Sequence, residues 1–201
     1  MSEKENMNKT IDYYNQNAAD FIAGTVAVDF TETQEQFRQL LPPGAFLLDF
    51  GCGSGRDTKY FLKQGFFVEA TDGSREICRT AEKFTGIPVR QMLFEELDEK
   101  EKYDGIWACA SILHLPKKKL PDVLQKMCNA LKMRGVIYTS FKYGFFEGER
   151  VGRYFTYFTE ESFKEILAQV HGLEIEKTWI SGDARAGREN ERWLNVILRK
   201  R

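Results

Sequence analysis

The sequence lacks an excess of basic residues. Its 201 residues include 29 lysines and arginines against 30 aspartates and glutamates, a formal net charge of -1. A protein that holds nucleic acid mainly by neutralising phosphates needs a surplus of cationic side chains on one face. Short basic runs occur at 117–119 and 199–201, and solvated surface is the simpler interpretation of both. The composition therefore argues against nucleic acid as the main ligand.

Cysteine pairs and long apolar runs are also missing. The four cysteines lie far apart, with no CxxC pair and no nearby histidine, so neither a zinc site nor a disulfide framework is indicated. No stretch approaches the roughly 20 apolar residues that span a bilayer, and the N-terminus lacks the apolar stretch of a signal peptide. We therefore expect a cytoplasmic protein with no membrane segment and no metal.

Short apolar runs alternate with helical patterns along most of the chain. At 201 residues, a single domain covering 1–201 is the simplest organisation. Strands are expected at 45–49, 66–72, 87–91, 103–111, 135–141, 173–180 and 193–199. Helices are expected as a pair within 9–41 and at 57–65, 74–84, 117–132 and 160–169. This order predicts an α/β fold with a mostly parallel seven-stranded sheet, helices on both faces and an antiparallel C-terminal hairpin at the sheet edge.

Two segments stand outside this alternation. Residues 1–43 are polar, with scattered apolar residues at helical spacing before Pro42 and Pro43 stop the helix. Residues 142–159, KYGFFEGERVGRYFTYFT, are aromatic, charged and punctuated by glycine, and no regular period fits them. We interpret the second segment as a long loop of the kind that forms lids or binding sites.

A glycine-rich loop follows the first expected strand. That strand ends at Asp49, and the chain then turns through Gly51, Gly53 and Gly55 into a helix. Residues without Cβ let backbone N–H groups come close to a polar ligand. The spacing GxGxG matches neither the dinucleotide fingerprint nor the phosphate loop of nucleoside triphosphatases. A tight turn without a ligand is the alternative interpretation.

An acidic residue closes the second strand, where a ligand in this loop would extend. Asp72 lies 23 positions after Asp49, and a carboxylate there can accept hydrogen bonds from both hydroxyls of a ribose. The alternative is a structural role at the start of the next helix, beside Ser74.

Three motifs together resemble a known family. LLDFGCGSGRD, VEATDGS and LKMRGVIYTSF are similar to the first motif, the second motif and the later LKPGG stretch of class I methyltransferases that depend on S-adenosylmethionine (SAM). The resemblance runs from Tyr13 to Arg199, and the wider similarity is to small bacterial methyltransferases of the tellurite-resistance and methyltransferase-domain type. It implies a Rossmann-like three-layer sandwich, SAM as cofactor and S-adenosylhomocysteine as product.

The resemblance also implies a set of residues around SAM. The N-terminal helices would form a lid in which Tyr14 contacts the cofactor, although core packing explains this residue equally well. Arg56 would reach the SAM carboxylate or lie exposed in the first helical turn. In the family an acidic residue often contacts adenine after the third strand, whereas this chain offers apolar residues there. The expected cofactor residues are Tyr14, Asp49, Gly51, Cys52, Gly53, Gly55, Arg56, Asp72, Gly73, Met92, Leu93, Phe94, Ala110 and Ser111.

Methyl transfer needs alignment more than acid catalysis, and a base only where the acceptor loses a proton. We regard His114, Glu147 and Glu149 as candidate bases, with a buried structural imidazole as the alternative for His114. The loop 142–159 is expected to build the acceptor pocket, unless its aromatic residues are core. The candidate acceptor residues are Tyr143, Arg153, Tyr154 and Tyr157.

Three functions fit these observations. The first is methylation of a small molecule, for which a ring-lined pocket would suit a flat acceptor and Arg153 an anionic one. The second is methylation of tRNA, because GRYFTYFTEESF and WLNVILRK are similar to the end of wobble-uridine tRNA methyltransferases. The third is a SAM-binding module without catalysis. A monomer and a homodimer are equally compatible with the sequence.

Overall fold

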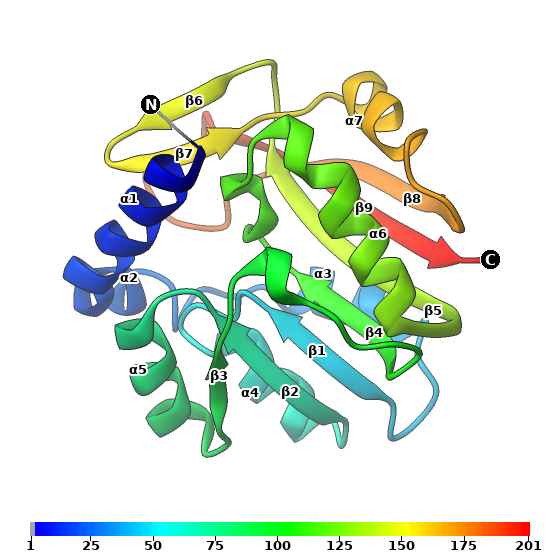
Figure 1. Cartoon of the computed structure of the whole chain (residues 1–201). Helices are drawn as coiled ribbons and strands as arrows, with labels where there is room; N and C mark the ends of the chain where they lie inside the picture. The colour runs from blue at the N-terminus through cyan, green and yellow to red at the C-terminus, as the bar shows by residue number, and fades with distance from the viewer. Residues whose placement is uncertain (1–2) are drawn as a thin grey trace.

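Residues 3–201 of the computed structural model are built around one seven-stranded sheet (Figure 1). The strand order is β3-β2-β1-β4-β5-β9-β8. The first five of these strands pair in parallel, and β9 pairs antiparallel with both β5 and β8. The strands are β1 (Phe46–Phe50), β2 (Phe67–Asp72), β3 (Val89–Gln91), β4 (Tyr103–Ala108), β5 (Leu131–Lys142), β8 (Leu173–Gly182) and β9 (Arg192–Lys200). The predicted fold is confirmed.

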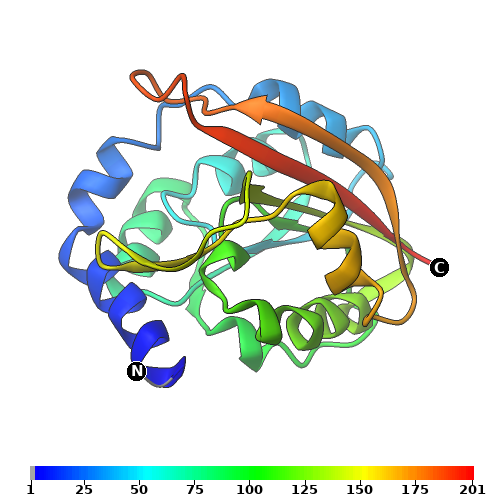
Figure 2. The same cartoon turned by 90° about the horizontal axis from the view of Figure 1, so that it is seen from above.

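Helices cover both faces of the sheet, as the view from above shows (Figure 2). Residues that pack beneath α3, α4 and α5 form one side of the core, and residues beneath α6 and α7 form the other. The helices are α1 (Glu3–Gln16), α2 (Ala18–Ala23), α3 (Thr31–Arg38), α4 (Arg56–Lys63), α5 (Arg75–Thr85), α6 (Leu120–Ala130) and α7 (Glu160–Leu167). None of the helices in 3–201 is long and apolar enough to cross a membrane.

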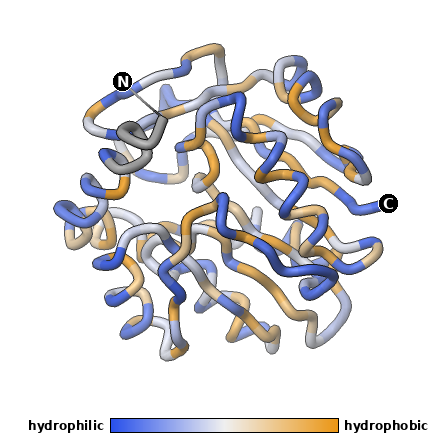
Figure 3. Tube along the Cα trace, viewed as in Figure 1, coloured by the Kyte–Doolittle hydropathy of each residue, from blue (hydrophilic) through white to orange (hydrophobic). Residues whose placement is uncertain are grey.

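The central strands are rich in hydrophobic residues (Figure 3), as expected where both faces of a sheet are covered. Side chains alternate between the two sides of a strand, so Leu47 packs under α3 and α4 while Leu48 packs toward α6. On the α3 and α4 side, Trp107 stacks on Tyr138 with ring centroids 4.1 Å apart. The ring of Phe61 contacts Trp107 edge-on from α4. These contacts fix the position of β4, whose carboxyl end borders the site described below.

Local signals set several boundaries where the sequence predicted them. The Ser74 side chain accepts a hydrogen bond from the backbone of Ile77 at 3.2 Å and caps α5. Gly86 ends the same helix in the left-handed region, at a φ of 82°. Thr159 caps α7. The helix predicted from 117 begins with a 3-10 turn at Lys117–Lys119 before α6.

Two segments differ from the prediction. Two helices were expected within residues 9–41, whereas the N-terminal part of the chain forms three, α1 to α3. The segment 142–159, expected as a loop, contains β6 (Glu147–Arg150) paired antiparallel with β7 (Arg153–Thr156). The two-residue turn places Val151 and Gly152 at φ values of 51° and 73°, the geometry of a type I′ hairpin turn. Valine is rare in this conformation, which is why the sequence gives no hairpin signal here.

We expect Phe61→Ala to lower the free energy of unfolding by about 3 to 5 kcal/mol, because the ring is fully buried between helix and sheet. Phe67→Ala is the matched control, since the Phe67 side chain is 68% exposed. Urea unfolding followed by circular dichroism measures both. Equal losses in the two variants would contradict this account of the core.

Candidate active site

A cavity opens at the carboxyl edge of the sheet, where the chain leaves β1 toward one side and β4 toward the other. Such switch points are where open α/β sheets bind ligands. The loops after β1, β2 and β4 form its floor, and α1, α2, β7 and the β8–β9 loop form its walls. Figure 1 shows α1 beside the β6–β7 hairpin on this side of the sheet.

The glycine loop lies on the cavity floor. Gly51 has a φ of 86°, and a Cβ there would lie 2.5 Å from the Cβ of Ser111 at the end of β4. The backbone N–H groups of Gly51 and Cys52 donate to the carbonyl of Thr71 at 2.9 and 2.8 Å. Gly55 does not line the cavity, because it packs against α5, where a Cβ would meet Thr85 at 2.6 Å. The loop is therefore pinned to two neighbouring strand ends.

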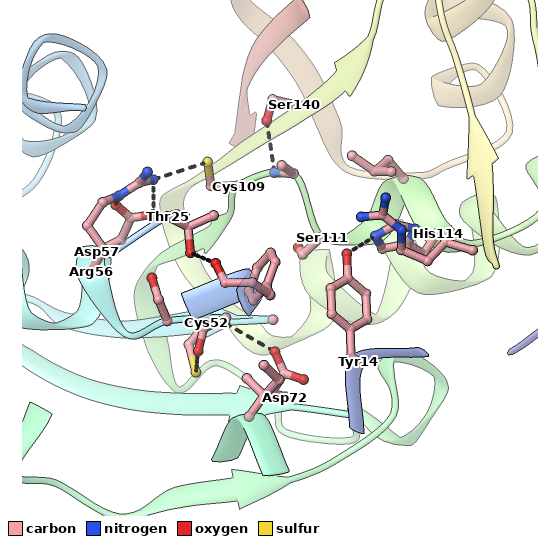
Figure 4. A pocket seen from close by; sticks show the side chains of 18 of the residues that line it. Tyr14, Thr25, Cys52, Arg56, Asp57, Asp72, Cys109, Ser111, His114 and Ser140 are labelled. Carbon is pink, nitrogen blue, oxygen red and sulfur yellow. Dashed lines mark hydrogen bonds and ion pairs between the residues drawn. The ribbon is translucent and has the colours of Figure 1, made fainter. Parts of the chain in front are cut away.

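Asp72 faces this loop from the end of β2 (Figure 4). Its carboxylate accepts hydrogen bonds from the backbone N–H groups of Gly53 at 3.1 Å and Ser74 at 2.9 Å. Burial raises the pKa of Asp72 to about 6, although these N–H groups and that of Gly73 oppose the shift. Both interpretations of Asp72 therefore have support, because it steadies the start of α5 and also lines the cavity.

Asp49 lies beneath the loop and does not reach the cavity. Its carboxylate accepts a hydrogen bond from the Thr58 hydroxyl at 2.5 Å. Burial, followed by the charge of Asp57, raises the pKa of Asp49 above its ordinary value. Its place in the structure is thus under the backbone that would contact a ligand.

Arg56 lines the cavity and is mostly buried. Its guanidinium donates to both carboxylate oxygens of Asp57, at 2.8 and 2.9 Å, and lies over the ring of Phe30 at 4.6 Å. Asp57 also accepts hydrogen bonds from Trp107 and Gln34. The ion pair holds the guanidinium at the cavity wall, so the interpretation of Arg56 as an exposed residue does not describe it.

His114 and Tyr14 meet across the cavity, although 100 positions separate them (Figure 4). His114 Nδ1 lies 2.6 Å from the carbonyl oxygen of Tyr154, and Nε2 lies 2.9 Å from the Tyr14 hydroxyl. A carbonyl only accepts, so Nδ1 carries the proton and Tyr14 donates to Nε2. Burial lowers the pKa of His114 to about 4, so the imidazole is neutral at pH 7.

The predicted acceptor residues divide into two groups along the hairpin. Arg153 lines the cavity. Tyr143, Tyr154, Tyr157 and Glu147 are not among the residues around it, and neither is Glu149. Glu147 instead accepts hydrogen bonds from the Tyr154 hydroxyl and the Lys117 backbone, both at 2.9 Å, while Glu149 pairs with Lys9. Alternation along β7 explains why Arg153 and Tyr154 differ, because Arg153 and Phe155 line the cavity and Tyr154 points away from it.

The remaining predicted cofactor residues gather at the cavity. Cys52, Gly73, Met92, Leu93, Phe94, Ala110 and Ser111 all line it. Sequence reasoning missed several lining residues, among them Asp183, Arg185 and Arg188. These three lie in the loop between β8 and β9, which reaches the site because β9 pairs antiparallel beside β5 and so begins at the same edge. The predicted C-terminal hairpin could have indicated that its loop lies at the site.

Comparison with known proteins adds to this geometry. A family model described as a methyltransferase domain matches residues 47–135, from β1 through the glycine loop into β5. No curated protein gave a match to the chain.

Solved structures resemble the chain beyond that domain. The 1,6-didemethyltoxoflavin N1-methyltransferase of Burkholderia thailandensis, with bound 1,6-didemethyltoxoflavin and S-adenosylhomocysteine, is 21% identical, covers 100% of this chain and 91% of its own, and has a TM-score of 0.80. The magnesium protoporphyrin IX methyltransferase of Synechocystis, with bound S-adenosylhomocysteine, is 18% identical. The match covers 97% of this chain and 100% of that protein, with a TM-score of 0.71. A TehB-like SAM-dependent methyltransferase of Corynebacterium glutamicum is 22% identical. The match covers 94% of this chain and 97% of that protein, with a TM-score of 0.68. The chain thus shares the Rossmann-like α/β fold of these methyltransferases.

We expect Gly51→Ala to destabilise the protein more than Gly86→Ala. Both glycines have a positive φ, which costs alanine about 1 to 2 kcal/mol, but only at Gly51 would the new Cβ collide with Ser111. Thermal unfolding of the two variants separates conformational strain from the close approach. Equal melting temperatures would show that the strand ends can move apart without cost.

We also expect the stability of the wild type relative to Asp72→Asn to fall as the pH rises from about 4 to about 6. The pKa of Asp72 is raised from 3.8 to about 6 on folding, so in this window the folded state binds more protons than the unfolded state, and stability declines with rising pH. Urea unfolding of both proteins at several pH values measures the difference. A wild type that gains relative stability over this window would contradict the assigned shift.

Proposed function

We propose that this protein transfers the methyl group of SAM to a small-molecule acceptor. The observation that carries the proposal is one cavity that joins the glycine loop and Asp72 on its floor to Tyr14, His114 and Arg153 on its wall. A cofactor bound along the floor would present its methyl group toward that wall. In-line attack on a sulfonium leaves a neutral thioether, so most of the acceleration comes from alignment in a dry pocket, which supplies roughly 7 to 11 kcal/mol in favourable cases.

In this proposal the ribose hydroxyls donate to Asp72, and the amino-acid part of SAM lies against the glycine loop near Arg56. Met92, Leu93 and Phe94 would enclose the adenine by apolar contact. Ala110 and Ser111 border the path to the methyl group. S-adenosylhomocysteine is the product.

Several observations support a small acceptor. The cavity walls are made by α1, the hairpin and the β8–β9 loop, which together enclose the space above the floor. Two of the structural neighbours are named as methyltransferases of small molecules, 1,6-didemethyltoxoflavin and magnesium protoporphyrin IX. The net charge of -1 gives no support to tRNA methylation. A cytoplasmic location and a monomeric or dimeric state stay predictions, as does the single domain 1–201 with its N-terminal lid.

Calorimetric titration with SAM and S-adenosylhomocysteine tests the proposal. We expect micromolar binding that Asp72→Ala weakens at least about tenfold, or 1.4 kcal/mol. Asp98→Ala is the control, because Asp98 is exposed and lies outside the cavity. Absence of binding by the wild type would refute the cofactor assignment.

Transfer of labelled methyl groups then separates the functions. Turnover with small acceptors supports the proposal, turnover with tRNA alone would replace it by the RNA alternative, and tight binding without any turnover would indicate a non-catalytic module.

A further inference from the structure

Three polar groups converge on the acceptor side of the cavity. Tyr14 comes from α1, His114 from the turn after β4 and Arg153 from β7. The Tyr14 hydroxyl donates to His114 Nε2, which leaves the phenol oxygen to act toward the cavity as an acceptor. The site therefore offers a hydrogen-bond acceptor that is itself linked to a neutral imidazole.

Arg153 is held in an unusual environment beside this pair. Its guanidinium lies over the rings of Tyr13 and Phe155, at 4.5 and 5.1 Å from their centroids. Its Nε–H is buried and has no hydrogen-bond partner among the described residues. A buried donor without a partner is costly, and a ligand atom that accepts from it removes that cost. A negatively charged oxygen is the acceptor that this group binds best.

We propose that Tyr14 and His114 form a proton relay and that Arg153 binds an oxygen of the acceptor, so that the acceptor is a weak oxygen or nitrogen acid, such as a phenol or a cyclic imide, whose conjugate base carries charge on oxygen. This inference rests on the proposed function. It assigns Tyr14 as the catalytic residue that contacts the acceptor and His114 as a residue that acts through Tyr14.

The acceptor atom X attacks the methyl carbon of SAM, the X–C bond forms, and the C–S bond breaks with its electron pair on sulfur. The X–H proton moves to the Tyr14 oxygen as the Tyr14 proton moves to His114 Nε2. The resulting imidazolium keeps its Nδ1–H bond to the carbonyl of Tyr154 and later releases its Nε2 proton to water.

A weakly basic imidazole is sufficient for this relay. The pKa of His114 is held near 4 by burial, and the nearby charge of Arg153 also lowers it. Methylation makes the X–H group far more acidic than it was, so a weak base can take the proton during or after attack. The loss of the sulfonium charge in the same step removes one cation from the neighbourhood of the new imidazolium.

Binding of 4-nitrophenol to protein saturated with S-adenosylhomocysteine tests the Arg153 assignment, because the absorbance of the phenolate reports its ionisation. We expect the bound phenol to have a pKa at least about one unit below its value in solution. Arg153→Met should abolish the shift and Arg153→Lys should keep part of it. Arg150→Met is the control, since Arg150 lies exposed on the same hairpin outside the cavity. No binding at millimolar phenol, or a shift that survives Arg153→Met, would overturn the assignment.

With SAM in place of the product, the yellow phenolate should be lost as its methyl ether forms. At a pH below the pKa of the bound phenol, where the acceptor still carries its proton, we expect Tyr14→Phe to lower kcat by roughly 100-fold, within the range for a general base, while the KM for SAM changes less than tenfold. A Tyr14→Phe enzyme with unchanged kcat, or one whose loss lies entirely in KM, would refute the relay.

Nitrogen-15 NMR tests His114 without any acceptor. The imidazole should show a protonated Nδ1 and an unprotonated Nε2 whose resonance moves in Tyr14→Phe, and His171, the second histidine of the chain, should not move. A protonated Nε2 would refute the relay. If S-adenosylhomocysteine binds but these results fail, only the relay and the acceptor class are lost; if it does not bind, the proposed function itself is wrong.

Discussion

The site depends on the close approach of two strand ends. Gly51 at the end of β1 and Ser111 at the end of β4 lie so near each other that no side chain fits between them. The Ser111 hydroxyl donates to the carbonyl of Phe50 at 2.6 Å, and on the other side the loop is tied to Thr71 of β2. Three adjacent strands therefore end in a single hydrogen-bonded floor. The cavity, the orientation of Asp72 and the start of α4 all follow from where this floor lies.

The floor is also rich in carboxylates for its size. Asp49, Asp57 and Asp72 lie around one loop, and Arg56 balances only the second of them through a two-point ion pair. Burial raises the pKa of Asp49 and Asp72, which means that the surrounding protein favours their neutral forms. A cation in the cavity would favour the charged forms of these carboxyl groups, and their negative charge would in turn attract the cation. A sulfonium ligand that also carries an ammonium group is the kind of molecule this charge pattern suits.

The sequence predicted the features that depend on neighbouring residues. The glycine turn, the acid that closes β2 and the Ser74 cap are contained in stretches of a few residues, and each occurs where expected. The hairpin within 142–159 was missed because Val151 occupies a turn position that normally takes asparagine or glycine. Without the hairpin, the alternation that turns Arg153 inward and Tyr154 outward could not be known. Long-range pairing was equally beyond local patterns, since the contact of Tyr14 with His114 depends on how α1 docks.

The docking of α1 joins the two halves of the cavity. On the acceptor side, the Thr10 hydroxyl accepts from the backbone of Tyr154 at 2.9 Å; on the cofactor side, the Asn15 side chain accepts from the Ser74 hydroxyl at 2.7 Å. Each such bond contributes only about 1 kcal/mol, so it is the sum of the contacts along the helix that holds α1 in place. Tyr14 lies on the same helix between these two contacts. The contact of its hydroxyl with His114 therefore depends on the docked position of α1, and so does this wall of the cavity.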